Sequence, residues 1–191
     1  MRHTFVALVE DKPGVLNRVV SLFRRRTFNI ESLTVGHTDH PGISRITIVV
    51  DSEQVAVERI TPYLYKLINV LQVEDLTHVP MVNRDLAMVK VRATPDRRVA
   101  IMQLVDVFRA RVVDVTNDSL IAEITGDEDK IDGFVDVLRP YGIIEMVRTG
   151  VVAMERGANT ALAPAYTSQN NRSSYHGSTP DNGRYIQASA D

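Results

Sequence analysis

The 191-residue sequence predicts an α+β protein made of two ferredoxin-like modules, each a four-stranded antiparallel sheet covered on one face by two helices. Three observations lead to this prediction. Apolar residues follow strand-like and helix-like periods in the order βαββαβ, this order recurs about 85 residues later, and turn residues separate the segments. Because modules of about 70 to 75 residues are small, the bare face of each sheet is expected to need a partner, which predicts an oligomer.

The elements of the first module follow from the spacing of its apolar residues. The stripe expected to face inward on the first helix contains Val15, Leu16, Val19, Val20, Leu22 and Phe23. Asp51 and Ser52 form an N-cap signal for the second helix, and Pro62 is expected to break or bend it in the middle. The expected elements are strand 3–9, helix 15–26, strands 31–37 and 43–50, a helix from 53 to about 68, and strand 70–76.

The second module repeats the pattern, with Leu22 and Phe23 expected to correspond to Val107 and Phe108. Its first helix is expected to direct Val99, Met102, Leu104, Val105 and Phe108 inward. The expected elements are strand 86–93, helix 94–110, strands 111–116 and 119–125, helix 126–142 and strand 143–150.

A change of composition after Gly157 indicates where the folded part ends. Residues 1–78 and 79–157 are expected to form the two domains, and residues 158–191 a disordered tail. The tail consists mostly of small and polar residues, so burial cannot offset the entropy lost on ordering. The alternative is a tail whose three tyrosines dock on a partner.

Composition excludes several classes of function. A balance of 22 basic and 24 acidic residues gives a net charge of −2, which provides no electrostatic reason to bind nucleic acid or a membrane surface. The absence of cysteine excludes disulfides, thiolate metal sites and a cysteine nucleophile. No window is apolar enough to cross a membrane, and the start has no signal-peptide core. We therefore expect a cytoplasmic protein.

No residues form a recognisable catalytic or metal-binding pattern. His37 and His40 lie in a hairpin loop without a third ligand at a recognisable spacing, which favours a solvated turn over a metal site. The three arginines at 24–26 are explained by the dipole at a helix C-terminus. Nucleophile-elbow, phosphate-loop and dinucleotide-binding motifs are missing.

The candidate binding site is the turn at residues 10–14 (EDKPG), between the first strand and the first helix. Pro13 presets the helix entry, and Gly14 lets a ligand approach the backbone. The amides of Gly14, Val15 and Leu16 would then bind a carboxylate at the helix N-terminus, while Asp11 holds an ammonium group. These two poles suit a free amino acid. Taken alone, however, this feature favours the simpler interpretation of an ordinary strand-to-helix turn, and its spacing does not decide between the two.

Longer stretches of the sequence identify it as a member of a family. DKPGVLNR at 11–18, FNIESLTV at 28–35 and SRITI at 44–48 resemble the N-terminal ACT domain of the small, regulatory subunit of acetolactate synthase, also called acetohydroxyacid synthase. DVT at 114–116 and RTGVVAMERG at 148–157 are similar to the second domain of that subunit. The resemblance covers essentially all of residues 1–157.

The resemblance implies a regulatory protein without a catalytic site. It would sense a branched-chain amino acid, usually valine, and would stimulate and feedback-inhibit a separate large subunit. That large subunit carries thiamine diphosphate, Mg²⁺ and FAD, whereas this chain would carry no cofactor. The rival interpretation is a free-standing ACT module that regulates another enzyme or a transcription complex.

In the family, two ACT domains pair side by side as a homodimer, and the effector lies between them. Many members have Asn where this chain has Asp11, which leaves the orientation of the ligand open. The second module has Ala93-Thr94-Pro95-Asp96 at its equivalent turn and, lacking the glycine, is expected to bind no valine. The effector residues implied by the resemblance are Asp11, Gly14, Val15 and Leu16 from one chain, and Asn29 and Ile30 from its neighbour.

Overall fold

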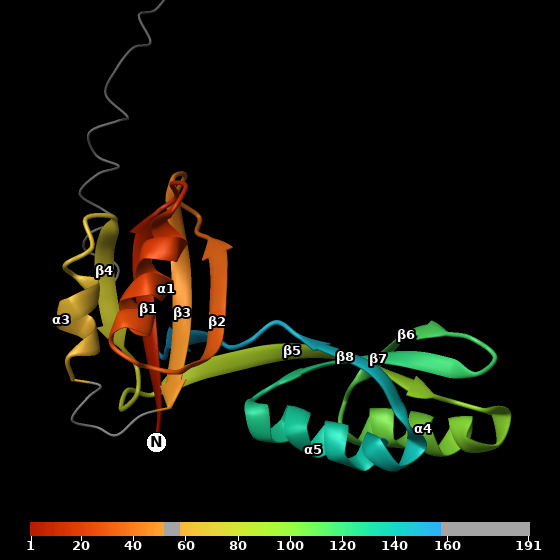
Figure 1. Ribbon diagram of the computed structural model, residues 1–191. Coiled ribbons are helices and arrows are strands. Elements are labelled where there is room, and N and C mark those ends of the chain that lie inside the picture. The colour runs from red at the N-terminus through yellow and green to blue at the C-terminus, as the bar shows by residue number, and fades with distance from the viewer. Residues whose placement is uncertain (52–57, 158–191) are drawn as a thin grey trace, which may run out of the picture.

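A computed structural model describes residues 1–51 and 58–157, and it confirms two ferredoxin-like modules joined by a long strand (Figure 1). In the first module the sheet order is β2-β3-β1-β4, all antiparallel, with helices on one face. The elements are β1 (Arg2–Glu10), α1 (Val15–Arg25), β2 (Ile30–His37), β3 (Ile43–Asp51), α3 (Ile60–Leu64) and β4 (Val70–Asp75).

The core of the first module lies between the helices and the side of the sheet to which Phe5, Ala7 and Val9 point. On α1 the buried side chains are Val15, Val19 and Phe23, which are spaced four residues apart. This stripe is narrower than expected. The prediction that Leu16 and Val20 face inward was wrong, since they are 41% and 36% exposed.

The second helix of this module differs from its prediction. Residues 52–57, where it was expected to begin, lie outside the described residues, and the described helix α3 spans only Ile60–Leu64. Pro62 lies in the first turn of α3, where a backbone N–H has no intrahelical partner. The proline therefore costs α3 no hydrogen bond. The described helix is not broken at Pro62, because Pro62 lies near its start and not in its middle.

The second module has the sheet order β6-β7-β5-β8. The prediction that Val99 and Met102 face inward was wrong, because they are 65% and 48% exposed. The buried stripe of its first helix instead runs through Ile101 and Val105. The elements are β5 (Met81–Arg92), α4 (Pro95–Val107), β6 (Arg111–Val115), β7 (Ser119–Gly126), α5 (Glu128–Leu138), a 3₁₀ turn at Arg139–Tyr141, β8 (Ile143–Arg148) and β9 (Val152–Glu155).

The backbone shows how the two modules correspond. Each first helix is followed by a non-glycine residue with positive φ, Thr27 at 56° and Arg109 at 53°. Counting back from these markers pairs Phe23 with Val105, and both are buried in their cores. The expected pairing of Phe23 with Phe108 was therefore out of register.

A two-stranded ribbon connects the modules and was not predicted. The first four residues of β5 pair with β9, from Met81 opposite Glu155 to Arg84 opposite Val152. Strand β5 consequently begins five residues before the expected start at residue 86, and it runs from one module into the other (Figure 1).

The ribbon covers part of the face of the first sheet that points away from the helices. Val6, Leu8 and Leu76 of the first module pack there with Ala153 of β9 in one buried cluster. The guanidinium of Arg45 also donates to the Ala153 carbonyl at 2.6 Å. The small size of the first module predicted that its bare sheet face needs a partner. The ribbon of the same chain covers part of that face.

A buried ion pair lies where the ribbon enters the second sheet. Asp85 is 3% exposed, and its carboxylate accepts a hydrogen bond from Arg148 Nε at 2.7 Å, while Arg148 Nη2 forms an ion pair with the same oxygen at 2.7 Å. The amide of Gly150 also donates to Asp85, at 3.2 Å. Burial disfavours the charge of Arg148, but its hydrogen bonds and attraction to Asp85 and Asp132 outweigh this and raise its pKa.

Gly150 permits a close approach between the two modules. Its φ is +85°, and a Cβ there would lie 2.7 Å from Oγ of Ser32 on β2. The next amide, that of Val151, donates to the same Oγ at 2.8 Å. A side chain at position 150 would therefore separate the modules at this contact.

We predict that Asp85→Ala lowers the free energy of unfolding by about 3–5 kcal/mol, because it leaves the partly buried Arg148 charge without its main partner. Chemical denaturation followed by circular dichroism measures this. The matched control is Asp136→Ala, which removes an exposed pair with Arg139 and should cost no more than about 1 kcal/mol. Equal losses in the two variants would contradict a special role for Asp85.

Candidate functional site

The turn between β1 and α1 has the geometry of an open helix N-terminus. Gly14 is the N-cap residue of α1, with φ 84° and ψ −6°, a left-handed conformation that favours glycine. Its carbonyl accepts the first helical bond, from the Arg18 amide at 3.1 Å. A Cβ at Gly14 would meet no atom within 4 Å, so the space beside this residue is open.

Backbone hydrogen bonds fasten the turn on two sides. The Asp11 amide donates to the Gly42 carbonyl at 2.8 Å, and the Glu10 amide donates to the Asn69 carbonyl at 2.9 Å. The first bond reaches the β2–β3 hairpin loop, and the second reaches the segment before β4. The shape of the turn is therefore set by its neighbours and does not depend on a ligand.

Side chains reinforce this attachment. The Asn69 amide group donates to the Glu10 carboxylate at 2.5 Å, and the Lys12 ammonium lies 3.1 Å from the same oxygen. The hydrogen bond from Asn69, followed by that from Lys12, lowers the pKa of Glu10. Arg18 in turn donates to Asn69 Oδ1 at 2.5 Å, which ties the first turn of α1 to the same group.

The predicted residues of the turn play unequal parts. The Val15 side chain is buried in the core, and its amide donates to the Lys12 carbonyl at 3.3 Å. Of the three amides predicted to receive a carboxylate, those of Gly14 and Leu16 therefore remain the candidates. The exposed Leu16 side chain adds apolar surface, and Asp11 provides an exposed carboxylate on the other side of Pro13.

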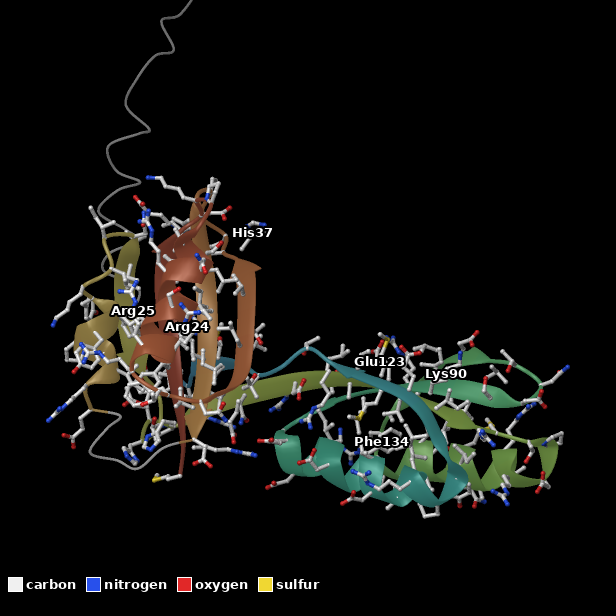
Figure 2. All side chains as sticks on the ribbon, viewed as in Figure 1. Arg24, Arg25, His37, Lys90, Glu123 and Phe134 are labelled. Carbon is white, nitrogen blue, oxygen red and sulfur yellow. The ribbon has the colours of Figure 1, made fainter. Side chains whose placement is uncertain are left out.

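His37 is a residue of this site that the sequence analysis missed. It ends β2, where Figure 2 labels it. Its Nδ1 lies 3.4 Å from Asp11 Oδ2. The sequence analysis considered His37 only together with His40, as part of a solvated loop. The pairing of the strands would have predicted this contact. Strand β3 pairs Ser44 with His37 of β2 and Ile43 with Glu10 of β1, so His37 lies close to the residue that follows Glu10.

Asn29 and Ile30 lie at the other end of the module. They follow the C-terminus of α1, an 11-residue helix whose length of about 16 Å separates them from Gly14. Asn29 is exposed, while Ile30 is half-buried against the core. A single chain therefore does not bring these two residues to the turn.

The equivalent turn of the second module is closed by an arginine. Arg98 stands in α4 where Leu16 stands in α1, and its NH2 donates to the carbonyls of Ala93, Thr116 and Asn117 at 3.1, 2.7 and 2.7 Å. Thr94 caps this helix with an ordinary extended backbone, φ −60°. The second turn thus lacks the positive-φ glycine and is held shut by its own side chain.

The described residues provide neither a metal-binding cluster nor a membrane-spanning helix. Across residues 1–51 and 58–157, no three His, Asp or Glu side chains gather in a way that could hold a metal ion. No helix in this part of the chain combines the length and apolar character needed to cross a bilayer.

Comparisons with known proteins agree across both modules. Residues 5–72 match the family described as AHAS small subunit-like ACT domain, and residues 84–157 match the small subunit of acetolactate synthase. The chain is 50% identical over 155 residues to the acetolactate synthase small subunit of Mycolicibacterium smegmatis, covering 81% of this chain and 91% of that protein. It is 46% identical over 158 residues to that of Bacillus subtilis, covering 82% and 92%.

A solved structure extends the comparison to the fold. The crystal structure of the acetolactate synthase small subunit from Thermotoga maritima superposes with a TM-score of 0.76 at 40% identity. The match covers 83% of this chain and 99% of that one, so it includes both modules.

We predict that Arg98→Ala lowers the free energy of unfolding by about 1.5–3 kcal/mol, the usual loss when hydrogen bonds to a charged group are removed. Urea denaturation measures the change. Arg97→Ala is the control, since Arg97 is exposed and its ion pair with Asp96 is long, at 3.8 Å, so about 0.5 kcal/mol or less is expected. An Arg98 variant as stable as the control would mean that the guanidinium does not hold the second turn closed.

Proposed function

The chain belongs to the family of acetolactate synthase small subunits, and we propose that it binds a branched-chain amino acid, with valine as the preferred ligand, at the Gly14 turn. By this binding it would inhibit the catalytic large subunit, which it otherwise stimulates. The observation that supports the proposal is the open space beside Gly14 at the N-terminus of α1, in a turn that also carries the exposed Asp11 carboxylate.

Each part of an amino acid has a counterpart in this turn. The carboxylate would lie at the positive end of α1, where the first amides of the helix lack intrahelical partners. The ammonium group would lie beside Asp11, which also stands 3.4 Å from His37. The exposed apolar pair Leu16 and Val20 would face a branched apolar side chain.

The free edge of β2 supports the proposal that two chains share this site. Strand β2 is the edge of its sheet, with β3 on one side only, and such an edge can pair with another strand. If two copies of β2 pair antiparallel, the start of one strand lies beside the end of the other. The partner's Asn29 and Ile30 would then approach His37, next to Asp11.

Contacts of β2 offer a route from the effector site to the second module. Ser32 accepts the hydrogen bond from the Val151 amide, and Arg2 forms ion pairs both with Glu31 of β2 and with Glu128 of α5. A shift of β2 on effector binding would therefore reach the second module directly. A coupling of about 1–3 kcal/mol is sufficient to change affinity 5- to 150-fold.

We assign this chain no catalytic residue and no cofactor, and place thiamine diphosphate, Mg²⁺ and FAD in the large subunit. Its partners would be that subunit, a second copy and the amino acid, in the cytoplasm. The match over residues 84–157 favours this role over a free-standing ACT module, which would not need a second domain of this family.

We predict that Gly14→Asp abolishes valine binding and feedback inhibition but leaves stimulation of the large subunit intact. The new side chain would fill the open space and place a negative charge against the ligand carboxylate. Calorimetric titration with valine and an acetolactate assay measure the two effects. Gly157→Asp is the matched control, because Gly157 also has positive φ and open space. A Gly14 variant that binds valine like this control would disprove the site.

We also predict that valine strengthens dimerisation, because a ligand held by two chains stabilises their pairing. The expected stabilisation is RT ln(1+[L]/Kd), about 2.7 kcal/mol when valine is at a hundredfold excess over its Kd. Sedimentation velocity at several protein concentrations, with and without valine, measures it. A monomer that binds valine with full affinity would refute the shared site.

A further inference from the structure

A positively charged groove lies on the helix-covered side of the first module, between α1 and the segment containing α3. Its volume is about 400 Å³, and its lining includes Arg18, Arg25, Arg26 and Lys66 but no acidic side chain. Within residues 1–51 and 58–157, none of these four cations has a carboxylate within 4.0 Å. The chain as a whole has a net charge of −2, so this excess is local.

The helix dipole does not account for the whole groove. Arg25 and Arg26 stand at the C-terminus of α1, where cations are favoured. Arg18 lies near the opposite end of that helix, and Lys66 lies on a different segment. A ligand with negative charge in the groove would be attracted by all four cations.

The floor of the groove is apolar and carries an aromatic ring between two cations. Leu22, Leu67 and Tyr63 provide the apolar surface. The guanidinium of Arg26 lies 4.1 Å from the centroid of the Tyr63 ring, and the ammonium of Lys66 lies 5.3 Å from it. The ring attracts both cations, while the cations repel each other. An anion bound between them would remove this repulsion.

The spread of the charges indicates the kind of ligand. Arg18 and Arg25 are separated by about 10 Å along the axis of α1, with Leu22 between them on the same face. A single phosphate would need donors that converge to about 3 Å from its oxygens. Carboxylates spaced one or two turns apart on an amphipathic helix, with apolar side chains between them, match the groove better.

We propose that this groove docks an acidic amphipathic segment of the catalytic large subunit. The inference rests on the proposed function, which requires contact with that subunit. Three other surfaces of the first module are used in that function, because the ribbon covers part of one sheet face, while the β2 edge would pair with a second copy and the Gly14 turn would take the amino acid. The helix-covered face stays open in such a dimer.

The test is a double charge reversal, Arg25→Glu with Lys66→Glu, in the full chain. Surface plasmon resonance measures binding of the purified large subunit at low and high salt. We expect the association rate at low salt to fall at least about tenfold, and the difference to shrink at high salt. A valine titration of the variant should match wild type, which separates this surface from the effector site.

Arg24→Glu with Arg59→Glu is the matched control. It makes the same change in net charge, with one substitution in the last turn of α1 and one beside α3, but neither residue lines the groove. Figure 2 labels Arg24 and Arg25 next to each other on this helix. The control should retain binding within about threefold, since only long-range attraction is reduced. Unchanged melting temperatures would show that both double variants are folded.

Three outcomes would overturn the inference while leaving the proposed function standing. In the first, test and control lose binding equally, which means that net charge alone matters. In the second, the test variant binds the large subunit normally but loses self-association, which assigns the groove to a second copy. In the third, the test variant binds the large subunit normally but no longer binds inorganic phosphate or an oligonucleotide. A wild-type chain that does not bind the large subunit would overturn both proposals.

Discussion

The structure depends on burial of β1 on both of its faces. Every residue from His3 to Val9 is buried, because alternate side chains pack against the helices on one side and partly against the ribbon on the other. A shift of register by one residue would exchange these two faces and would mismatch both. The strand therefore has one position, and the turn that follows it at Glu10 to Gly14 is placed with the same precision.

This constraint explains how a small turn can serve as a binding site. A ligand that meets amides and a carboxylate already in place does not have to order them, and so loses less entropy on binding. The cost of ordering is met by folding, through the contacts of Glu10 and Asp11 with Asn69 and Gly42. The same strand links the site to the second module, since its far face carries the ribbon.

The two modules show how one fold can keep or lose a binding site. Their first turns occupy the same place, and in each the first residue after the strand is fastened to the neighbouring hairpin loop. The Asp11 amide donates to the Gly42 carbonyl in one module, and the Ala93 amide donates to the Asp118 carbonyl in the other. In the first turn a left-handed glycine and an exposed leucine leave room. In the second, Arg98 takes the place of Leu16 and binds the backbone carbonyls itself. The difference lies in a few side chains and not in topology.

The sequence alone determined the fold class, the order of most elements and the residues of the turn, because helix and strand periods and turn chemistry are local properties. It also placed the family through long matching stretches. Only the tertiary structure decided that residues 81–84 pair with 152–155, that His37 approaches Asp11, and that Leu16 and Val20 remain exposed. The first two features are contacts between segments far apart in the chain. The third depends on which apolar residues of a helix another segment covers, and the spacing of apolar residues along one helix does not determine this.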